Sequence, residues 1–414
     1  MSLELANSQY KLEDLCLQIT DGKHGDCENQ EKSGYYFVSV KDIDEGEIDY
    51  SNARQITKDD FEDTDKRTKL ENEDILITNS GTIGKFVFVN SPLSRKTTFQ
   101  KSVAIIKPDK NKILPKFLYY YLISEKRRLI EYAGGTTQKN LLLRDIRNFE
   151  VEIPNEIQQK KIINILNDID NLIKVKKTLN KNLDDLLDSL FKEHFINKFD
   201  NADINWKIKK IDELPLIITD YVANGSFASL KENVSILDHE DYAYFIRNTD
   251  LKAKCFEKFV NKHSYDFLKK SSLYGNEIII SNVGDVGSVF LCPFLDKPMT
   301  LGNNMILVKS NDDAIYLNFY LFLLFRSNFG QYLISTITAG SVQSKFNKTE
   351  FKSLELIMPD DEVIIKFNEF VSPIFDYKNK ISDEITNLTK LRDTLLPKLM
   401  SGEIDVSEIN CDLE

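Results

Sequence analysis

The chain has 414 residues, 42% of them hydrophobic, with a formal net charge of −11. This length is about twice the commonest domain size and the apolar content supports packed cores, which excludes a disordered chain and predicts two globular units. Five scattered cysteines and four scattered histidines exclude a disulfide framework and a zinc cluster, and they favour unpaired thiols in the cytoplasm.

The first predicted region, residues 1–155, is a mixed domain rich in strands. Its opening residues, Met1–Tyr10, lack a basic stretch followed by an apolar core, so no signal peptide is expected. The runs FVSV, ILIT, FVFV and VAII combine β-branched and aromatic residues between Gly and Asn, which indicates strands. Residues 114–132 show the apolar spacing of a helix.

Residues 156–199 are predicted to form a long helix with a coiled-coil seam. Apolar residues recur there with a period of seven, in two series that are three residues apart. The first series comprises Ile162, Ile169, Leu183 and Leu190, and the second comprises Ile165, Leu172, Leu179 and Leu186. A 3.5-residue repeat sustained over about four heptads is typical of a coiled coil. Lys176 interrupts the first series, either to set the register or to extend its charge into solvent.

The next region, residues 200–359, repeats the first. Residues 75–89 (ILITNSGTIGKFVFV) are similar to residues 278–292 (IIISNVGDVGSVFLC). Later, GGTTQKN at 134–140 is echoed by AGSVQSK at 339–345. An internal repeat of this length predicts two similar domains, and its shared glycines favour a turn geometry rather than a ligand contact.

The most apolar run of the chain lies inside this second region, at residues 315–325. It contains Asn318 and is too short to span a bilayer. A buried helix is therefore expected there, and no association with a membrane.

Residues 360–401 predict a second long helix, followed by a C-terminal tail at 402–414. Its heptad series comprises Phe367, Ile374, Ile381, Leu388 and Leu395. Because domains and helices alternate, the second half can fold back on the first, so that the helices pair antiparallel. The predicted fold is α+β: two mixed strand-rich domains joined by two long helices in an antiparallel coiled coil, with a pseudo-twofold internal repeat. The first seam would span about 42 Å, against about 34 Å for one turn of B-DNA.

The negative charge is distributed unevenly along the chain. Residues 40–65 hold three Lys/Arg against ten Asp/Glu, and residues 353–414 hold six against fourteen. Residues 66–107 hold eight Lys/Arg against three Asp/Glu, residues 126–148 six against two, and residues 247–270 seven against three. Local basic surfaces decide phosphate contact more than the total charge does, so both domains could meet nucleic acid; an ordinary mixed surface is the alternative.

Motifs of catalysis are missing from the sequence. Residues 81–86 (GTIGKF) lack the first glycine and the final Ser/Thr of a phosphate-binding loop, and the matching GDVGSV lacks the lysine as well. The sequence has no dinucleotide fingerprint, adenine-methyltransferase tetrapeptide, nucleophile elbow or H-E-x-x-H helix. Together with the repeat, this favours binding over catalysis, with no metal and no cofactor held by the chain.

Several segments resemble Type I restriction–modification specificity subunits. The most specific are LRDTLLPKLMSGEIDV (391–406), EIQQKKIINILNDIDNLI (156–173) and LDSLFKEHF (187–195). Four segments of the first domain are also typical of the family: ITDGKHG, YYFVSVKDI, DILITNSGTIGK and GGTTQKN. The resemblance covers nearly the whole chain; its departures lie in the second half, where ISNVGDVG is a loose version and residues 221–245 match nothing familiar.

The resemblance implies a non-catalytic subunit that binds double-stranded DNA. Two target-recognition domains, residues 1–155 and 200–359, would each read one half of an asymmetric split site. The spacer helices would fix the unread gap. Two modification subunits would dock on the spacers and methylate adenine N6 with S-adenosylmethionine, and restriction subunits, where present, would cleave DNA using ATP and Mg²⁺.

Candidate DNA-binding residues are polar or basic residues near the predicted turns. Those expected to contact bases in the first domain are Lys23, His24, Ser80, Thr82 and Gln138. Those expected to contact phosphates there are Arg67, Lys69, Arg95, Lys96 and Lys139. The second domain offers Ser226, Arg247, Asn248, Asp285, Gln343 and Lys345. For each residue the alternative is a turn side chain that bonds its own backbone, or a solvated charge.

Three other kinds of protein share parts of this pattern. A non-catalytic coiled-coil adaptor would share the architecture but would not need basic segments in both domains. A specificity subunit of a related, non-Type I restriction–modification system would share the sequence features as well. A two-domain nuclease or methyltransferase would need acidic clusters or a cofactor loop. The target bases depend on loop geometry that no motif encodes.

Overall fold

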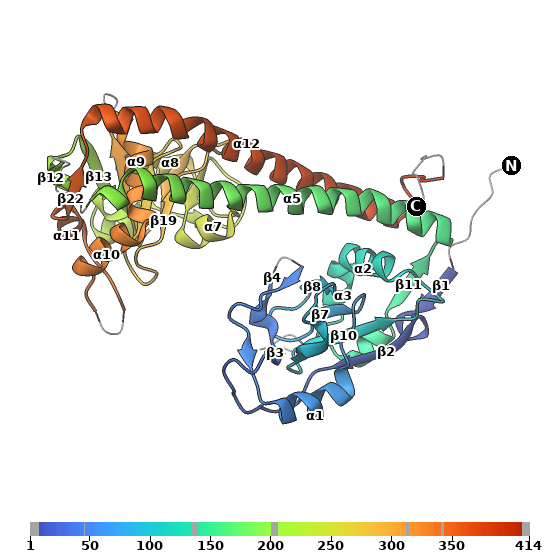
Figure 1. The fold of residues 1–414 in the computed structure, drawn as a ribbon. Helices are drawn as coiled ribbons and strands as arrows, with labels where there is room; N and C mark the ends of the chain where they lie inside the picture. The colour runs from blue at the N-terminus through green and yellow to red at the C-terminus, as the bar shows by residue number, and fades with distance from the viewer. Residues whose placement is uncertain are drawn as a thin grey trace. The chain divides into compact units, whose positions relative to one another are not determined.

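The computed structural model describes residues 8–44, 46–134, 140–199, 206–311, 314–340 and 343–407. It divides into two compact units: unit 1 is Met1–Val175 with Thr386–Glu414, and unit 2 is Lys176–Ile385. The long helices α5 (Glu156–His194) and α12 (Asp361–Met400) each contribute to both units (Figure 1). The segments expected as separate spacers are therefore shared between the two units.

Unit 1 is a mixed domain of short strands and short helices. Its strands are β1 (Ser8–Lys11), β2 (Cys16–Asp21), β3 (Tyr36–Val38), β4 (Ile43–Asp44), β5 (Glu47–Ile48), β6 (Arg54–Gln55), β7 (Ile75–Thr78), β8 (Phe86–Phe88), β9 (Thr97–Phe99), β10 (Val103–Pro108) and β11 (Glu150–Ile153). Its short helices are α1 (Lys58–Thr68), α2 (Pro115–Ser124), α3 (Lys126–Glu131) and α4 (Leu143–Arg147). The central sheet has the order β2-β10-β7-β8, and separate small sheets are formed by β1-β11, β6-β3-β9 and β4-β5.

Unit 2 repeats this plan with a larger insertion. Its strands are β12 (Lys207–Lys210), β13 (Leu216–Asp220), β14 (Ile236–Leu237), β15 (Ala243–Ile246), β16 (Phe259–Val260), β17 (Ser272–Leu273), β18 (Ile278–Ser281), β19 (Val289–Leu291), β20 (Met299–Leu301), β21 (Met305–Ser310) and β22 (Glu355–Met358). Its short helices are α6 (Phe227–Asn233), α7 (Asn248–Ala253), α8 (Lys262–Phe267), α9 (Leu317–Arg326), α10 (Asn328–Ile337) and α11 (Lys348–Lys352). The sheets β13-β21-β18-β19 and β12-β22 match two sheets of unit 1, whereas β14-β16-β15-β20-β17 is larger than its counterpart.

The two middle strands of each central sheet are buried on both faces. In β7, Ile75 and Ile77 join the core that contains α2, while Leu76 joins a second core on the other face. In β18, Ile278 and Ile280 likewise join the core that contains α9, and Ile279 faces the opposite core. Since neighbouring residues of a strand point to opposite faces, an unbroken run of apolar residues is required in both strands.

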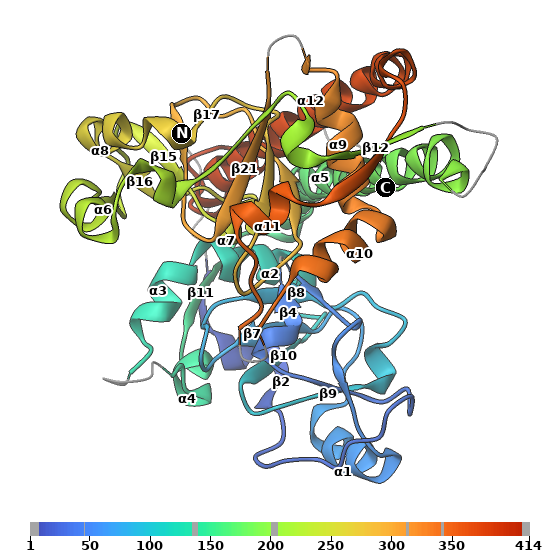
Figure 2. The same ribbon diagram turned by 90° about the vertical axis from the view of Figure 1, so that its left-hand side faces the viewer.

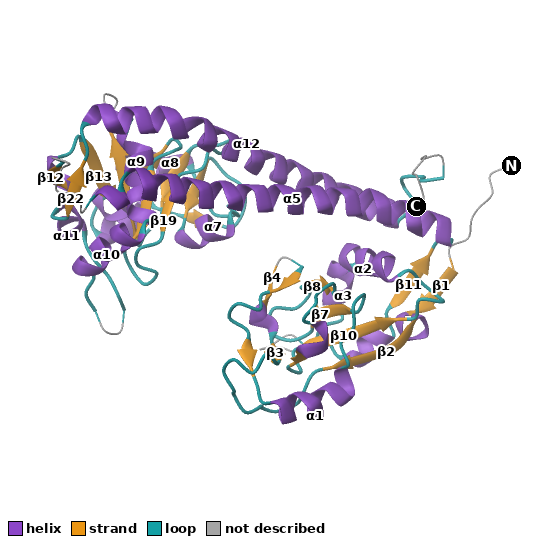
Figure 3. Ribbon diagram, in the orientation of Figure 1, coloured by secondary structure: helices purple, strands orange, loops and turns teal. Residues whose placement is uncertain are grey.

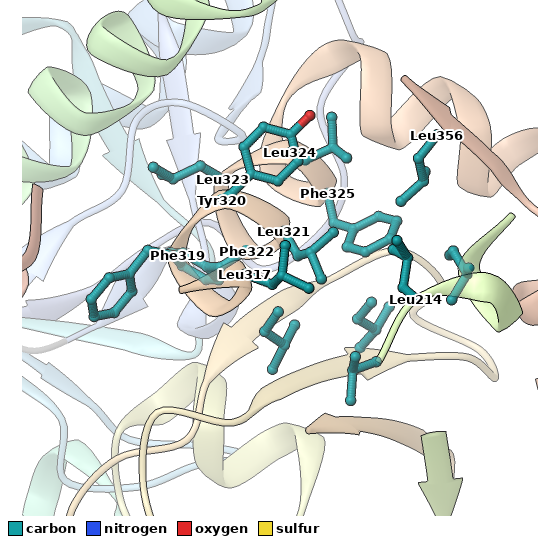
Figure 4. Close-up of a cluster of buried hydrophobic side chains, with 14 of the residues drawn as sticks. Leu214, Leu317, Phe319, Tyr320, Leu321, Phe322, Leu323, Leu324, Phe325 and Leu356 are labelled. Carbon is teal, nitrogen blue, oxygen red and sulfur yellow. The ribbon is translucent and has the colours of Figure 1, made fainter. Parts of the chain in front are cut away.

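Most of the apolar run at 315–325 lies in α9, which is part of the largest core of unit 2 (Figure 4). Leu321 and Leu324 are fully buried, and the Tyr320 hydroxyl donates to the Ile357 carbonyl at 2.8 Å. A helix that is apolar on nearly all sides is stable only when it is surrounded by other elements. The expectation of a buried helix is confirmed. Within the described ranges, no helix is long and apolar enough to cross a membrane.

The helices α5 and α12 pack against each other (Figure 3). In unit 1 the Arg392 guanidinium donates to Asp170 Oδ1 at 3.3 Å. In unit 2 Lys176 Nζ lies 2.5 Å from Glu384 Oε2. Partners later in α5 are earlier in α12, which defines the antiparallel direction. The predicted α+β class with two strand-rich units and paired long helices is confirmed, and Lys176 contacts the partner helix rather than solvent alone.

The predicted heptad series of α12 lies along the helix pair. Its members are all buried or half-buried: Phe367, Ile374, Ile381, Leu388 and Leu395. The first series of α5 behaves in the same way, with Ile162 and Ile169 buried and Leu183 and Leu190 half-buried.

The second series of α5 is placed differently from the prediction. Leu172 and Leu186 are 49% and 44% exposed, while Ile165 and Leu179 are half-buried. The series that the structure buries beside the first lies one residue later: Leu166, Ile173, Asn180 and Leu187. Positions three and four residues apart both neighbour a given residue on a helix, so the heptad period alone did not decide which of them is covered.

Candidate nucleic-acid interface

In unit 1, four loops meet at one edge of the central sheet. The strands β2 and β7 both pair antiparallel with β10, so the chain leaves both of them at the same edge. The Lys23 amide donates to the Phe99 carbonyl at 2.8 Å, the Lys101 amide to the Lys23 carbonyl at 3.1 Å, and the Leu141 amide to the Asn79 carbonyl at 2.8 Å. We name this surface edge 1; it comprises the loops 22–25, 79–85, 100–102 and 140–142, together with the Arg67 side chain, which extends from α1 (Lys58–Thr68) to Asp21 at the end of β2.

Unit 2 has a matching edge. The strands β13 and β18 both pair antiparallel with β21, and so they also end side by side. The Asn282 amide donates to the Asn304 carbonyl, and the Phe346 amide donates to the Asn282 carbonyl, each at 3.1 Å. We name this surface edge 2; it comprises the segments 221–226, 282–288, 302–304 and 343–347, residues 247–252 at the start of α7, and the Lys348 side chain of α11. Each unit thus presents loops from distant parts of its sequence on one surface.

The repeated glycines shape the turn at the centre of each edge. Gly81 and Gly84 have φ of 76° and 82°, and Gly284 and Gly287 have φ of 78° and 93°. Only glycine adopts these left-handed conformations without strain. The glycines therefore set the backbone of the two turns, in agreement with the turn geometry expected from the sequence, while the side chains between them remain available for contact.

The basic candidates on edge 1 are paired with carboxylates. Lys23 Nζ lies 2.8 Å from Asp60 Oδ1, and this hydrogen bond raises the pKa of Lys23. Asp21 accepts from the Arg67 guanidinium, and it also lies 3.2 Å from His24 Nε2. The structure thus brings Lys23, His24 and Arg67 together around the end of β2, although the sequence assigned them to different roles.

Two further candidates of unit 1 lie in the central turn of edge 1. Thr82 is exposed, and its backbone carbonyl accepts from Thr78 Oγ1 at 2.6 Å. Ser80 is half-buried and forms a bridge with Asn140. Gln138 and Lys139 lie outside the described residues.

The remaining phosphate candidates of unit 1 lie away from edge 1. Lys69 ends α1, and its carbonyl accepts from Lys107 Nζ at 2.8 Å, at the far end of β10. Arg95 Nη2 lies 2.8 Å from Glu71 Oε1, close to the start of β7. Lys96 is exposed and precedes β9. The structure therefore separates Lys69, Arg95 and Lys96 from the other candidates of this unit.

In unit 2 two candidates, Asn248 and Asp285, are in direct contact. Asp285 Oδ2 accepts from Lys252 Nζ at 2.6 Å, Ser288 Oγ at 2.7 Å and Asn248 Nδ2 at 3.0 Å. The hydrogen bonds to Lys252 and Asn248 lower the pKa of Asp285 to about 2, so the carboxylate is ionised at neutral pH. Within the described part of the chain, Asn248 Oδ1 is buried without a partner. Leaving such an oxygen unpaired costs about 1–3 kcal/mol, while the amide nitrogen of the same side chain donates to Asp285.

The other candidates of unit 2 are spread around edge 2. Arg247 is held by Asp250 in a two-pronged ion pair, with Nε 2.9 Å from Oδ2, and this pairing raises the pKa of Arg247. Ser226 Oγ caps α6 by accepting from the Ser229 amide at 3.3 Å. Gln343 and Lys345 are exposed beside the central turn, where Lys345 bridges Val283.

Sequence reasoning missed the carboxylate that ends the first strand of each central sheet. Asp21 and Asp220 are both buried, and Lys348 Nζ lies 2.9 Å from Asp220 Oδ1. The signal was present, because the tripeptide ITD occurs at 19–21 and again at 218–220. Lys252 and Lys348 carried no such signal, since only the packing of α7 and α11 brings them to edge 2.

The two edges carry polar groups that are suited to binding. Among the residues the structure describes, no three His, Cys, Asp or Glu side chains are grouped as a metal site. The edges instead carry hydrogen-bond donors and acceptors: hydroxyls, amides, paired cations and the ionised Asp285. Such groups can recognise base edges and phosphates. Fold and edges together define a binding protein made of two related units with different contact surfaces.

Comparison with known proteins identifies the family to which this binding protein is similar. Residues 9–185 and 203–388 match the family described as Type I restriction modification DNA specificity domain. The chain is 25% identical over 362 residues to the Type I restriction enzyme MjaIX specificity subunit of Methanocaldococcus jannaschii, covering 81% of this chain and 78% of that protein. It is 21% identical over 398 residues to the HindI specificity subunit of Haemophilus influenzae, covering 78% and 84% of the two chains.

A solved structure shares the fold. The crystal structure of a Type I restriction–modification S subunit from M. genitalium covers 96% of this chain, with a TM-score of 0.52 and 16% identity, and 97% of that subunit is matched. The chain belongs to the family of Type I restriction–modification DNA specificity subunits. Such subunits are the non-catalytic components of Type I restriction–modification complexes and bind no cofactor themselves.

Proposed function

We propose that this subunit reads an asymmetric, bipartite DNA site, with edge 1 contacting one half and edge 2 the other. One observation carries the proposal: matching edges present different side chains on the same backbone. The central turn offers Ser80 and Thr82 in unit 1, and Val283 and Asp285 in unit 2. A shared scaffold with unlike contact residues is what two unlike half-sites require.

General rules of DNA recognition suggest which side chains of each edge contact bases and which contact phosphates. Side chains of the central turns would approach base edges in the major groove, where a good bidentate pair discriminates by about 1–3 kcal/mol. Paired cations such as Arg67 and Lys348 would contact phosphates, which give affinity and register without sequence information.

The paired long helices would fix the unread gap and hold the partner subunits. Exposed apolar side chains on their outer faces are Leu172, Val175 and Leu391 in unit 1, and Leu186, Phe370 and Tyr377 in unit 2. We propose that two modification subunits dock on these faces and methylate adenine N6 with S-adenosylmethionine. Restriction subunits, where present, would add cleavage driven by ATP and Mg²⁺, in the cytoplasm where the chromosome lies.

The charge distribution supports a need for partners. Lys23, Arg67 and Arg247 are each paired with a carboxylate, so their positive charge is partly neutralised in the chain alone. We expect the isolated subunit to bind its site weakly and the complex with modification subunits to bind it tightly. In a gel-shift assay, equal affinity of the lone subunit and the complex would contradict this.

Methylome sequencing of cells with and without this gene tests the function. A bipartite, adenine-methylated site should disappear on deletion and return on complementation. Replacing residues 1–155 by those of another family member should change one half of the site and leave the other unchanged. An unaltered methylation pattern on deletion would favour an adaptor role instead.

A further inference from the structure

The central turns of the two edges match in backbone and differ in one chemically informative side chain. The Gly84 amide donates to the Thr78 carbonyl at 2.9 Å, and the Gly287 amide donates to the Ser281 carbonyl at 3.0 Å. Because both turns follow matching strands and close in the same way, Thr82 and Asp285 occupy equivalent positions. A hydroxyl can donate or accept a hydrogen bond, whereas an ionised carboxylate can only accept.

Asp285 is held more firmly than a surface carboxylate needs to be. Lys252 Nζ, Ser288 Oγ and Asn248 Nδ2 all bond to the same oxygen, Oδ2, at 2.6, 2.7 and 3.0 Å. These donors come from α7 and from the turn itself, so they fix the orientation of the carboxylate. The Asp285 side chain nevertheless remains 40% exposed. A fixed, exposed acceptor is suited to a directional contact with a hydrogen-bond donor of a ligand.

The four bases differ in whether they offer such a donor. In the major groove, cytosine presents the N4 amino group, and adenine presents N6 beside the acceptor N7. Guanine presents the acceptors N7 and O6, and thymine presents the acceptor O4 and a methyl group. A carboxylate is repelled by acceptors and by phosphate, so cytosine is the base whose edge it fits best.

We infer that Asp285 requires a cytosine at one position of the half-site read by unit 2, and that it accepts a hydrogen bond from the cytosine N4 amino group. The inference rests on the proposed function, because it needs edge 2 to face the DNA. The low pKa of Asp285 means that the requirement persists across the neutral range. Lys252 and Asn248 are positioning residues in this arrangement.

The first test is Asp285→Asn in the complex with its modification subunits, followed by methylome sequencing. An amide both donates and accepts and pairs with adenine N6 and N7. The preference for cytosine should therefore fall about tenfold or more at one position, in favour of adenine, while the other half-site stays unchanged. Asp266→Asn, an exposed aspartate on α8 of the same unit, is the control and should leave the site unchanged.

A second test alters the DNA. Duplexes are prepared in which each cytosine of this half-site is replaced in turn by 2-pyrimidinone, which lacks the amino group. The wild-type complex should lose about tenfold in affinity at one position, and the Asp285→Asn complex should be insensitive there. Lys252→Met should slow methylation a few-fold but keep the same site, because Asn248 and Ser288 still hold the carboxylate.

Two results would overturn the inference. One is an Asp285→Asn complex that retains the full preference for cytosine. The other is a wild-type complex that tolerates loss of the amino group at every cytosine of the half-site. Neither touches the proposed function, which fails separately if the wild-type gene directs no bipartite methylation.

Discussion

The two units of this protein differ where they are exposed and agree where they are buried. In unit 1 Lys107 reaches the buried Asp74, and in unit 2 Lys309 occupies the matching position on β21, near the buried Glu277. The insertions diverge instead: unit 1 has the three-stranded sheet β6-β3-β9, and unit 2 has a five-stranded sheet with α6 and α8 beside it (Figure 2). The two units thus share a buried scaffold, whereas their exposed contact surfaces differ.

This difference shows how one fold can serve two DNA half-sites. A residue packed from both sides, such as Ile77 or Ile280, cannot change without a cavity or a clash. The side chain at the position shared by Thr82 and Asp285 can differ between the units, because the glycines beside it hold the backbone of the turn. Specificity can therefore vary while the turn keeps its shape.

The largest expected effect tests the shared core. Leu122→Ala in α2 and Leu324→Ala in α9 remove matching, fully buried side chains, one from each unit. Each should lower the free energy of unfolding of its unit by about 2–5 kcal/mol, since the transfer and cavity terms add. Chemical denaturation followed by fluorescence measures this. A loss below about 1 kcal/mol in one unit alone would show that the scaffolds are not equivalent.

The next effect concerns an ion network of unit 2. Asp184 accepts from the Arg326 guanidinium at 2.7 Å and pairs with Lys378. Burial raises its pKa, but hydrogen bonds from Lys378 and Arg326 outweigh burial and hold the pKa below its usual value. The folded-state pKa lies below the unfolded one, so Asp184 stabilises the unit at neutral pH, and this stabilisation is lost as the pH falls through the folded-state value.

Asp184→Asn should therefore destabilise unit 2 by about 1–3 kcal/mol at pH 7, because it leaves Lys378 without its counter-ion. The difference from wild type should shrink as the pH falls below about 4. Denaturation measured between pH 3 and pH 7 checks this. Asp185→Asn, an exposed neighbour on α5, is the control. A pH-independent difference would contradict the assignment.

A smaller effect distinguishes the two central turns. Gly84→Ala and Gly287→Ala both place a side chain at positive φ, which costs about 1–2 kcal/mol. A Cβ at Gly287 would also lie 2.7 Å from Gln331 Oε1, against 3.1 Å from the nearest atom at Gly84. Gly287→Ala should therefore be the more harmful of the two, in unfolding measurements and in methylation rate. The reverse order would mean that Gln331 moves aside easily.

The smallest effect tests which cations serve DNA binding. Arg95→Ala should change stability by less than about 0.5 kcal/mol, because its pair with Glu71 is exposed. Since Arg95 lies away from edge 1, the salt dependence of DNA binding by the complex should not change. Arg67→Ala on edge 1 should reduce the slope of log K against log salt by about one. If Arg95→Ala also reduced this slope, Arg95 would belong to the DNA-binding surface, contrary to the prediction.

The candidate site was only partly predictable from the sequence. Asp285 and Gln343 were predicted because they lie next to the repeated glycine turns. These turns can be recognised in the sequence, because their positive φ angles require glycine at fixed positions. Lys252 and Lys348 were not found, because they reach edge 2 only through helices that pack against it. Likewise, the distance of Lys69 and Arg95 from edge 1 depends on the direction of α1 and β10 in space.

By itself, the sequence determined the internal repeat, the strand-rich units, the two long helices and the family, because period, glycine position and apolar content are local properties. Only the tertiary structure decided which flank of α5 is covered, which loops share an edge and which charges are paired. Those properties depend on contacts between residues far apart in the chain. Asn180 is an example: neither its burial nor its bond to Ser382 at 3.3 Å follows from a heptad pattern.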